Sequence, residues 1–466
     1  MYFRQYELPC LSLFSYMIGD ERTGRAVVVD PQRDVSGYLA DAEANGLKIE
    51  LILETHFHAD FLSGHLELAE ATGATIAYGS EARADFPIRR LSDRERIELG
   101  DVVLEARHTP GHTPESISIV VWGHADDEVP WAVLTGDTLF VGDVGRPDLL
   151  TSIGWTADDL ARRLYRSLHD QLLTLPDETR VFPAHGAGSA CGKSMSEAVS
   201  STIGEQRLTN YALRPMTEDE FVTAVTEGQS VAPLYFAFTA DSNRRQRDLF
   251  DDSEAPRRLD LAELERCRRE EAVLIDGRAP EAFASGHVAG SVNVGLDGRF
   301  AEYAGDVVRP GQAVVVLTDD GRETEARVRL ARIGFDRVRG AVVDVERVLA
   351  DHPELAERAH RVSAADLDAW RIDGPELQIV DIRGPGEPEV GLVPGAVHIP
   401  LAQLLDRHGE LDTSTPVVVY CAGGYRSSIG ASLLRSLGFE RVADLQGGFD
   451  AWAAGGFGID QGALAR

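Results

Sequence analysis

The C-terminal part of this 466-residue chain contains one strand-and-loop pattern twice. In each copy a short apolar strand ends in Asp-x-Arg, at Asp276 and at Asp381, and a Gly follows that Asp by fourteen residues, at Gly290 and at Gly395. Each copy continues with a Val-rich strand, a helical stretch and a Gly-Phe pair. This pattern predicts a tandem repeat of one α/β unit.

The rest of the sequence predicts a larger N-terminal domain. At roughly 150 residues per domain, a chain of this length holds about three domains. A polar, charged segment at 239–258 indicates a linker before the repeat. A second break lies at 351–361, before a helix that we expect to start at Ser363. We therefore predict domains at 1–245, 259–355 and 360–466.

The charge and the cysteine content limit the classes of partner and the cell compartment that we expect. With 76 acidic and 46 basic residues the net charge is −30, which disfavours binding to nucleic acid and to anionic membrane surfaces. Four cysteines in so long a chain do not form a disulfide framework. We find no signal-peptide pattern and no apolar run of membrane-spanning length. We expect a cytoplasmic protein, and assembly into a homo-oligomer is compatible with the sequence.

The first domain alternates short apolar strands with helical stretches. We predict strands at 26–29 and 49–53 and, between them, a helix at 38–44 that Gly46 ends. Polar clusters fall repeatedly where a strand ends. In α/β folds, sites assemble at such strand ends.

Histidines and aspartates form the clearest of these clusters. A His-x-His-x-Asp run directly follows the strand that ends at Leu53, and the other members lie in later Gly- or Pro-containing turns. The residues are His56, His58, Asp60, His112, Asp137 and His185. Imidazole and carboxylate groups are ligands for zinc, iron and manganese. Their convergence at one sheet edge predicts a metal site.

Together with Asp30 in Val28-Val29-Asp30, this motif set resembles the metallo-β-lactamase fold superfamily over about residues 1–240. The resemblance implies an αβ/βα sandwich with metal at one edge. The superfamily includes two-metal hydrolases and mononuclear iron persulfide dioxygenases, so the fold alone does not choose the reaction.

One position helps to separate these two chemistries. Two-metal hydrolases of the glyoxalase II type carry a second-metal His directly after the motif Asp, where this chain has Phe61. A phenyl ring cannot bind metal, which weakens a second site unless His65 substitutes. Resemblance to the persulfide dioxygenases then implies one Fe(II) bound by His56, His112 and Asp137. It also implies that ligands and water are oriented by His58, Asp60 and His185.

Two further segments of the first domain, around Arg146 and around Cys191, each allow two interpretations. Arg146 and Asp148 follow the Asp137 strand on a Gly-rich loop, and they either bind a charged thiol substrate or simply pair with each other. Cys191 lies in a small-residue loop after His185. We favour a packing role for it over a redox role.

The second repeat contains a cysteine at the end of a strand. The strand at 417–420 runs into Cys421-Ala-Gly-Gly-Tyr-Arg426, and a helix follows. A thiol at a helix N-terminus, surrounded by backbone N–H groups and an Arg, is a nucleophile at neutral pH. With Asp381-x-Arg383, this loop resembles a rhodanese domain over roughly residues 360 to 460.

The length of the Cys421–Arg426 loop separates two activities of this fold. It spans six residues, as in sulfurtransferases, and related phosphatases use one more. The resemblance implies sulfane sulfur as the substrate, with Cys421 as the nucleophile and Arg426 stabilising anionic groups. Thr318 occupies the aligned position in the first repeat, which we therefore predict to be a catalytically silent rhodanese-like domain, either a spacer or a docking surface.

The whole chain resembles the persulfide dioxygenase and rhodanese fusions of bacterial sulfide detoxification. This implies that glutathione persulfide or another thiol persulfide is oxidised by O2 to sulfite. It also implies that Cys421 interconverts persulfide plus sulfite with thiosulfate. Two alternatives stay open: a zinc thioester hydrolase fused to rhodanese domains, and a non-enzymatic sulfur carrier or sensor.

Overall fold

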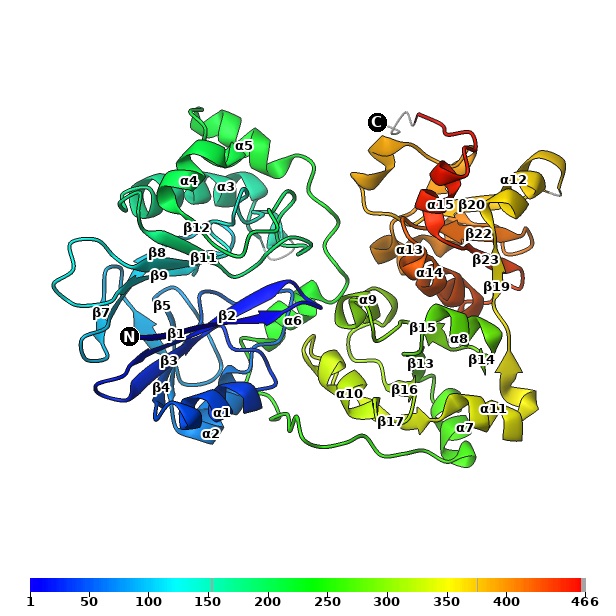
Figure 1. Ribbon diagram of the computed structural model, residues 1–466, viewed down its shortest axis with the longest axis horizontal. Coiled ribbons are helices and arrows are strands. Elements are labelled where there is room, and N and C mark those ends of the chain that lie inside the picture. The colour runs from blue at the N-terminus through cyan, green and yellow to red at the C-terminus, as the bar shows by residue number, and fades with distance from the viewer. Residues whose placement is uncertain (152–153, 375, 462–466) are drawn as a thin grey trace. The chain divides into compact units, whose positions relative to one another are not determined.

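The computed structural model describes residues 1–151, 154–374 and 376–461 (Figure 1). The chain forms two compact units. The first unit comprises Met1–Ala232 and Phe236–Asp252, and the second comprises Pro233–Tyr235 and Ser253–Arg466. The polar segment predicted as a linker is therefore divided, because its part up to Asp252 packs with the first unit. The three predicted domain boundaries remain predictions.

Two six-stranded sheets form the first unit. The first sheet has, in spatial order, β1 (Tyr2–Leu8), β2 (Leu13–Asp20), β3 (Arg25–Val29), β4 (Lys48–Leu53), β5 (Thr75–Gly79) and β6 (Arg89–Leu91). The second has β12 (Ser201–Thr202), β11 (Arg180–Pro183), β10 (Ala132–Gly136), β9 (Ile117–Trp122), β8 (Val103–His108) and β7 (Arg96–Glu98). The predicted strands at 26–29 and 49–53 are confirmed as parts of β3 and β4.

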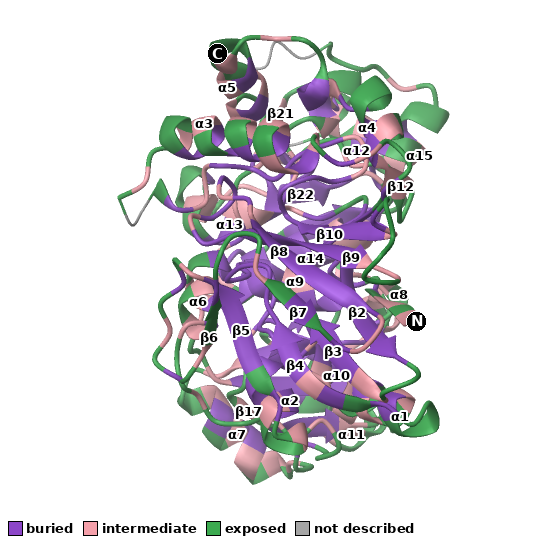
Figure 2. Ribbon diagram, turned by 90° about the vertical axis from the view of Figure 1, so that its left-hand side faces the viewer, coloured by how far each residue is buried: buried purple, intermediate pink, exposed green. Residues whose placement is uncertain are grey.

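Alternation along the strands produces the layers of the sandwich. Successive side chains of a strand point to opposite faces of its sheet. Val27 and Leu51 belong to the core between the two sheets, whereas Val28 and Ile52 pack on the other face with the nearby helices. Because both faces of β3 and β4 are covered, each strand contains a continuous apolar run, at 26–29 and at 51–53. Figure 2 shows most of β2, β3, β4 and β5 as buried.

Helices cover the outer faces of both sheets (Figure 1). The first sheet is covered by α1 (Ser36–Ala44) and α2 (His65–Thr72). The second is covered by α3 (Ala157–Ser167), α4 (Ile203–Thr209) and α5 (Glu218–Thr226), and α6 (Phe236–Ser242) follows. The predicted helix at 38–44 is confirmed within α1. The predicted αβ/βα sandwich is confirmed.

The second unit contains two parallel sheets, one for each copy of the repeat. The first copy has β15 (Val292–Asn293), β13 (Val273–Asp276), β16 (Val314–Thr318) and β17 (Val338–Val343), with a separate pair of β14 (His287–Val288) and β18 (Ala356–Glu357). The second has β19 (His360–Val362), β23 (Val442–Leu445), β22 (Val417–Tyr420), β20 (Gln378–Asp381) and β21 (Ala396–His398).

Helices flank each of these sheets. The first copy has α7 (Leu261–Arg269), α8 (Pro280–Ser285), α9 (Phe300–Val307), α10 (Glu323–Ala331) and α11 (Val345–Asp351). The second has α12 (Ala364–Asp373), α13 (Leu401–Arg407), α14 (Tyr425–Ser436) and α15 (Gly448–Ala454). A capping box begins α12, in which Ser363 and Asp366 satisfy each other's backbone N–H groups. This confirms the predicted helix start at Ser363.

The strand register confirms the tandem repeat. Asp276 of β13 pairs with Leu317 of β16, and Asp381 of β20 pairs with Tyr420 of β22. The next residues along the chain, Thr318 and Cys421, are therefore structural counterparts. The glycines fourteen residues after each Asp both adopt the left-handed backbone conformation, with φ of +79° and +82°. Among the described residues no helix is long and apolar enough to cross a membrane.

Candidate metal centre and cysteine loop

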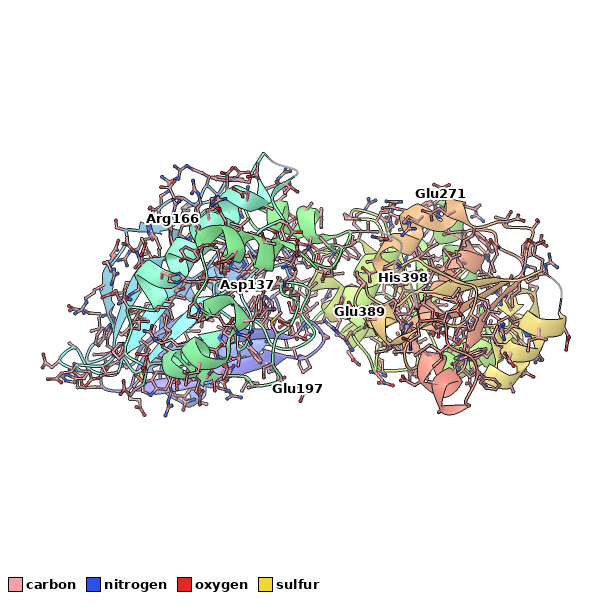
Figure 3. The ribbon with its side chains drawn as sticks, turned by 90° about the horizontal axis from the view of Figure 1, so that it is seen from above. Asp137, Arg166, Glu197, Glu271, Glu389 and His398 are labelled. Atoms are coloured by element: carbon pink, nitrogen blue, oxygen red, sulfur yellow. The ribbon has the colours of Figure 1, made fainter. Side chains whose placement is uncertain are left out.

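Three of the predicted ligands converge at one edge of the first unit's sandwich. His56 follows β4, His112 follows β8 and Asp137 follows β10. All three are buried, and Asp137 is labelled in Figure 3. The Asp137 Oδ2 atom lies 3.8 Å from His56 Nε2 and 3.4 Å from His112 Nε2. Strand ends of both sheets thus bring two imidazoles and one carboxylate together.

Hydrogen bonds made by the Nδ1 atoms orient the imidazole rings of His56 and His112. The Thr55 hydroxyl donates to Asp30 Oδ2 at 2.8 Å and therefore accepts from His56 Nδ1 at 2.9 Å. His112 Nδ1 donates to the Arg146 carbonyl oxygen at 2.9 Å. With the proton on Nδ1 in each ring, both Nε2 lone pairs face the cluster, the arrangement that metal-binding histidines adopt.

The unpaired atoms of the cluster test whether a metal fits there. His56 Nε2 and both Asp137 carboxylate oxygens are buried without a hydrogen-bond partner among the described residues. Such atoms are costly to bury unless they are compensated. Two imidazole nitrogens and one carboxylate suit a divalent transition metal with open coordination positions. The residues present therefore fit a metal ion.

A second group of side chains lies beside the first. Ligand atoms of His58, Asp60 and His185 lie within 4.8 Å of one another. His185 Nε2 is 3.3 Å from Asp60 Oδ2 and 3.4 Å from Asp137 Oδ1, which connects the two groups.

His58 is also held from its other side. Its Nε2 lies 3.0 Å from Asp30 Oδ1, and its ring packs against Phe61 with centroids 4.4 Å apart. Burial by itself would lower the pKa of His58, but the charge of Asp30 and its hydrogen bond raise the pKa to about 9. The contact with Asp30 therefore holds the His58 ring in place.

His65 lies elsewhere. Its Nδ1 atom is 3.5 Å from Glu54 Oε1, and its ring stacks on Phe86. Among the described residues it belongs to none of the groups with converging ligand atoms. Substitution of His65 for the His missing at position 61 therefore has no support.

Two backbone features allow this close packing. Asp30 has φ of +51°, a conformation that non-glycine residues rarely adopt and that is often found at functional sites. In this conformation its carboxylate reaches the backbone N–H of Thr55 as well as its hydroxyl. A Cβ atom on Gly145 would lie 1.9 Å from the Asp137 carbonyl oxygen, so only glycine fits there.

Arg146 and Asp148 form an ion pair with each other. Arg146 Nε and Nη2 donate to the two Asp148 carboxylate oxygens at 2.7 and 2.8 Å. The same guanidinium donates to the carbonyl oxygens of Ala190 and Ser230. Because its donors are occupied and its side chain is buried, the pairing alternative describes Arg146 better than substrate binding.

Cys191 lies closer to the metal cluster than we expected. Ligand atoms of Asp137, His185 and Cys191 lie within 4.8 Å of one another, and Cys191 is buried. Burial, followed by the charges of Asp60 and Asp137, raises the pKa of the Cys191 thiol. The loop after β11 folds back on its own His185, and only the short spacing between His185 and Cys191 hinted at this in the sequence.

The segment that we predicted as a linker clamps the metal-binding loop. The Asn243 side chain donates to the carbonyl oxygens of His58 and Phe61 at 2.8 and 2.9 Å and accepts from the Ser63 N–H at 2.9 Å. Arg247 binds the Glu67 carboxylate. Sequence reasoning missed both residues, because each meets its partners across about 180 positions of chain.

In the second unit, Cys421 lies where β22 meets α14. Its Sγ atom accepts a hydrogen bond from the Gly424 N–H at 3.1 Å, and Gly424 precedes α14 with φ of +101°. The Phe449 N–H donates to the Cys421 carbonyl oxygen at 2.7 Å and fixes the start of the loop. Backbone donors at a helix N-terminus stabilise a sulfur anion.

Arg426 has a partner that the sequence did not reveal. Its two terminal nitrogens each donate to one Glu387 carboxylate oxygen at 2.6 Å. Burial favours neutral Glu387, yet hydrogen bonding and charge from Arg426 hold the pKa of Glu387 below its usual range. The Arg426 charge is therefore balanced by Glu387, and the Gly424 N–H is the backbone donor directed at the Cys421 sulfur.

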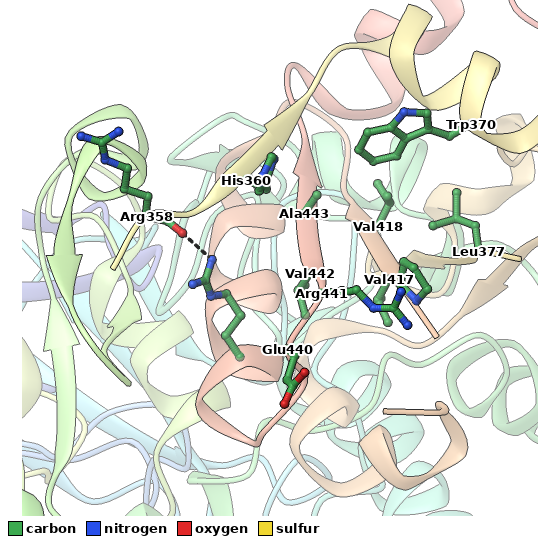
Figure 4. Close-up of a pocket in the computed structure, with 12 residues that line it drawn as sticks. Arg358, His360, Trp370, Leu377, Val417, Val418, Glu440, Arg441, Val442 and Ala443 are labelled. Carbon is green, nitrogen blue, oxygen red and sulfur yellow. Dashed lines mark hydrogen bonds between the residues drawn. The ribbon is translucent and has the colours of Figure 1, made fainter. Parts of the chain in front are cut away.

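The opposite edge of the same sheet contains a cavity of about 390 Å³ (Figure 4). Val417, Val418 and Val442 lie in its wall, with Trp370 and Arg441 also among its lining residues. Because Val417 begins β22 whereas Cys421 follows its end, this cavity is separate from the cysteine loop.

Comparison with known proteins places this geometry in a family. Residues 9–185 match the metallo-beta-lactamase superfamily, and residues 260–340 and 363–455 each match the rhodanese-like domain. A crystal structure of a metallo-beta-lactamase from Staphylococcus aureus is 32% identical, with a TM-score of 0.66, over 73% of this chain and 98% of that one. The chain belongs to the metallo-beta-lactamase superfamily. It carries two rhodanese-like domains after its metallo-beta-lactamase domain.

The curated proteins that this chain resembles differ in activity. Human mitochondrial persulfide dioxygenase ETHE1 is 29% identical over 246 residues, which cover 52% of this chain and 87% of that protein. The cytoplasmic hydroxyacylglutathione hydrolase of Arabidopsis thaliana is 35% identical over 183 residues, which cover 39% of this chain and 66% of that protein. Similarity alone therefore does not choose between oxidation and hydrolysis.

Proposed function

We propose that this protein oxidises a low-molecular-weight thiol persulfide to sulfite in its first domain and transfers sulfane sulfur through Cys421. Its place is in sulfide detoxification. The observation that carries the proposal is the pairing, in one chain, of a two-His, one-carboxylate cluster with a six-residue cysteine loop. The similarity to a persulfide dioxygenase and the two rhodanese-like domains support it.

Fe(II) is the metal that we propose for His56, His112 and Asp137. When bound, ferrous iron supplies open coordination positions and the redox chemistry by which O2 oxidises a terminal sulfur. The balanced reaction is R–S–SH + O2 + H2O → RSH + SO3²⁻ + 2H⁺. Glutathione persulfide is a suitable substrate, because only the S–S bond and the terminal sulfur change.

The residues around the cluster have distinct tasks. Thr55 and the Arg146 carbonyl hold the two imidazoles with their Nε2 atoms inward. His58, paired with Asp30, lies beside the centre as a supporting group. His185, which contacts Asp137, and Asp60, which pairs with His185, would orient water.

Sulfur transfer at Cys421 proceeds in two balanced steps. The thiolate attacks the terminal sulfur of a persulfide, Cys421–S⁻ + R–S–SH → Cys421–S–SH + RS⁻. Sulfite then takes that sulfur, Cys421–S–SH + SO3²⁻ → Cys421–SH + S2O3²⁻, and the sequence of steps also runs in reverse. The N–H groups at the start of α14 stabilise the sulfur anion in both steps.

Metal analysis combined with oxygen uptake tests the first activity. We expect the purified full chain to bind about one iron per chain and to consume O2 with glutathione persulfide, releasing sulfite. His56→Ala should lose both iron and oxygen uptake. The matched control is His124→Ala, since His124 is an exposed histidine of the same domain. Stoichiometric zinc with thioester hydrolysis and no oxygen uptake would overturn the proposal in favour of a hydrolase.

A further inference from the structure

The first repeat contacts the cysteine-bearing helix of the second through a buried asparagine. The Asn293 Oδ1 atom accepts from the Ser428 hydroxyl at 2.7 Å, and its backbone N–H donates to Ser432 Oγ at 2.9 Å. All three residues are buried, and both serines lie on α14, which begins at the Cys421 loop. Buried hydrogen bonds of this kind fix a helix in both position and rotation.

Asn293 is itself anchored in the first repeat. Its Nδ2 atom donates to the carbonyl oxygens of Asp276 and Arg278 at 3.1 and 2.9 Å. The strand register makes His398 its counterpart in the second repeat, where the His398 ring bonds only to the Arg383 carbonyl oxygen among the interactions described. The first repeat thus uses the equivalent position to hold its neighbour.

A second contact reaches the cysteine loop itself. The Tyr425 hydroxyl donates to the Gly295 carbonyl oxygen at 2.6 Å, and Tyr425 is the first residue of α14. A Cβ atom on Gly298 would lie 2.4 Å from Tyr425 Cζ, so the ring fills space that only glycine leaves open. Gly295 and Gly298 thus form a cradle for the Tyr425 ring. Arg329 donates hydrogen bonds to the carbonyl oxygens of Leu296 and Gly298 and so holds this segment in place.

We propose that the silent repeat is a positioning platform for the Cys421 loop, which it holds through Asn293 and through the Gly295–Gly298 cradle of Tyr425. The role rests on the proposed transfer at Cys421, yet it concerns the geometry of the loop and not the identity of the substrate. The sulfur anion is stabilised only where the backbone N–H groups point at it. A displacement of α14 therefore weakens the stabilisation.

Gly298→Ala in the full chain is the most direct test. The added methyl group displaces the Tyr425 ring, and we expect kcat for thiosulfate–cyanide sulfur transfer to fall about tenfold with little change in KM. Alkylation of Cys421 by iodoacetamide at pH 7, followed by peptide mass analysis, should slow as well. Oxygen uptake by the first domain of the same chain should not change. Gly286→Ala is the matched control, because its nearest neighbour would lie at an ordinary 3.6 Å.

A double-mutant cycle separates positioning from general destabilisation. If Tyr425 transmits the effect, Gly298→Ala should cost little more in a Tyr425→Ala background, and the two effects will not add. Should Gly298→Ala fail to fold, Tyr425→Phe and Ser428→Ala remove one hydroxyl each and should lower kcat several-fold, with a fall in melting temperature small enough that the chain stays folded in the assay.

The outcomes also separate this proposal from the proposed function. If the parent chain transfers no sulfur but Gly298→Ala still slows Cys421 alkylation, the transfer function is wrong and the platform stands. If Cys421 alkylation and kcat both stay at parental rates in Gly298→Ala, or in the two hydroxyl variants when Gly298→Ala does not fold, the platform is wrong.

Discussion

The two repeats have the same fold and differ at the position of the cysteine. Both keep the buried Asp-x-Arg pair, with Arg278 on Asp276 and Arg383 on Asp381 at 2.6 Å. Where the second repeat has Cys421, the first has Thr318, whose hydroxyl has no hydrogen-bond partner among the described residues. The Asp-x-Arg pair is therefore a feature of the shared fold. The cysteine and the residues that contact its loop differ between the two repeats.

The supports differ as well as the nucleophile. Glu387, which pairs with Arg426, follows Asp381 by six residues, and the same spacing from Asp276 leads to Ala282. In the first repeat, the loop arginine Arg322 instead pairs with Asp297 and Glu325. At these positions the first repeat therefore lacks both the sulfur of Cys421 and the carboxylate of Glu387.

Cys421→Ser should have the largest effect on this contrast. Serine cannot carry a persulfide sulfur, so we expect thiosulfate formation from persulfide and sulfite to fall by about 10³-fold or more. Oxygen uptake by the first domain should persist. Thr318→Ser is the matched control and should leave both activities unchanged. Persistent thiosulfate formation in Cys421→Ser would refute the transferase role.

Glu387→Gln should have the next largest effect. The variant removes the charge that balances Arg426 but keeps the side-chain shape. The Arg426 guanidinium then loses its ion pair and is no longer fixed beside the cysteine loop. We expect kcat/KM for sulfur transfer to fall about 10- to 100-fold. Glu389→Gln, two residues further along the same exposed turn, is the control. Equal activity of the two variants would show that Arg426 needs no partner.

Asp444→Asn should have a smaller effect, on stability. In the strand register, Asp444 of β23 is the counterpart of Ala341 in the first repeat. Burial raises the pKa of Asp444 to about 6, and Arg361 only partly offsets this. A carboxyl whose pKa is higher in the folded chain than in the unfolded chain stabilises the fold at low pH and ceases to do so as pH rises through 6.

The expected sign follows from that shift. At pH 8 the folded chain carries a buried charge at position 444, which Asn removes, so Asp444→Asn should gain up to about 2 kcal/mol in stability relative to its effect at pH 4.5. Thermal unfolding at the two pH values measures the difference. The exposed Glu440→Gln is the control. A variant whose effect is independent of pH would contradict the assigned pKa.

Thr318→Cys in a Cys421→Ser background should have the smallest effect. A thiol placed in the first repeat lacks the Glu387 counterpart and lies before a loop built differently around Arg322. We expect no measurable return of sulfur transfer. Recovered transfer would show that the missing thiol alone silences the first repeat.

Much of the fold was predictable because its signals are local. Strand alternation, the Ser363 helix start and the fourteen-residue spacing in each repeat all depend on residues close in sequence, and the structure confirms them. The convergence of His56, His112 and Asp137 was also predictable, since each follows a strand and strand ends meet at one sheet edge.

The missed residues share a physical cause. Asn243 reaches the metal-binding loop, Glu387 reaches Arg426 and Asn293 reaches α14 through contacts between residues far apart in the chain. No local pattern encodes such a meeting. Cys191 was underrated for a related reason, since the path of its loop back toward Asp137 depends on packing.

Residue identity alone revealed the order of the domains, the candidate ligand types, the cysteine loop and the Thr at position 318 of the first repeat, where the second repeat has Cys421. These follow from residue identity and short-range spacing. Only the folded structure revealed that Arg146 pairs with Asp148, that His58 is held by Asp30, and that the first repeat contacts the cysteine-bearing helix. A side chain's partner depends on which groups share its buried surroundings, and those surroundings exist only once the chain has folded.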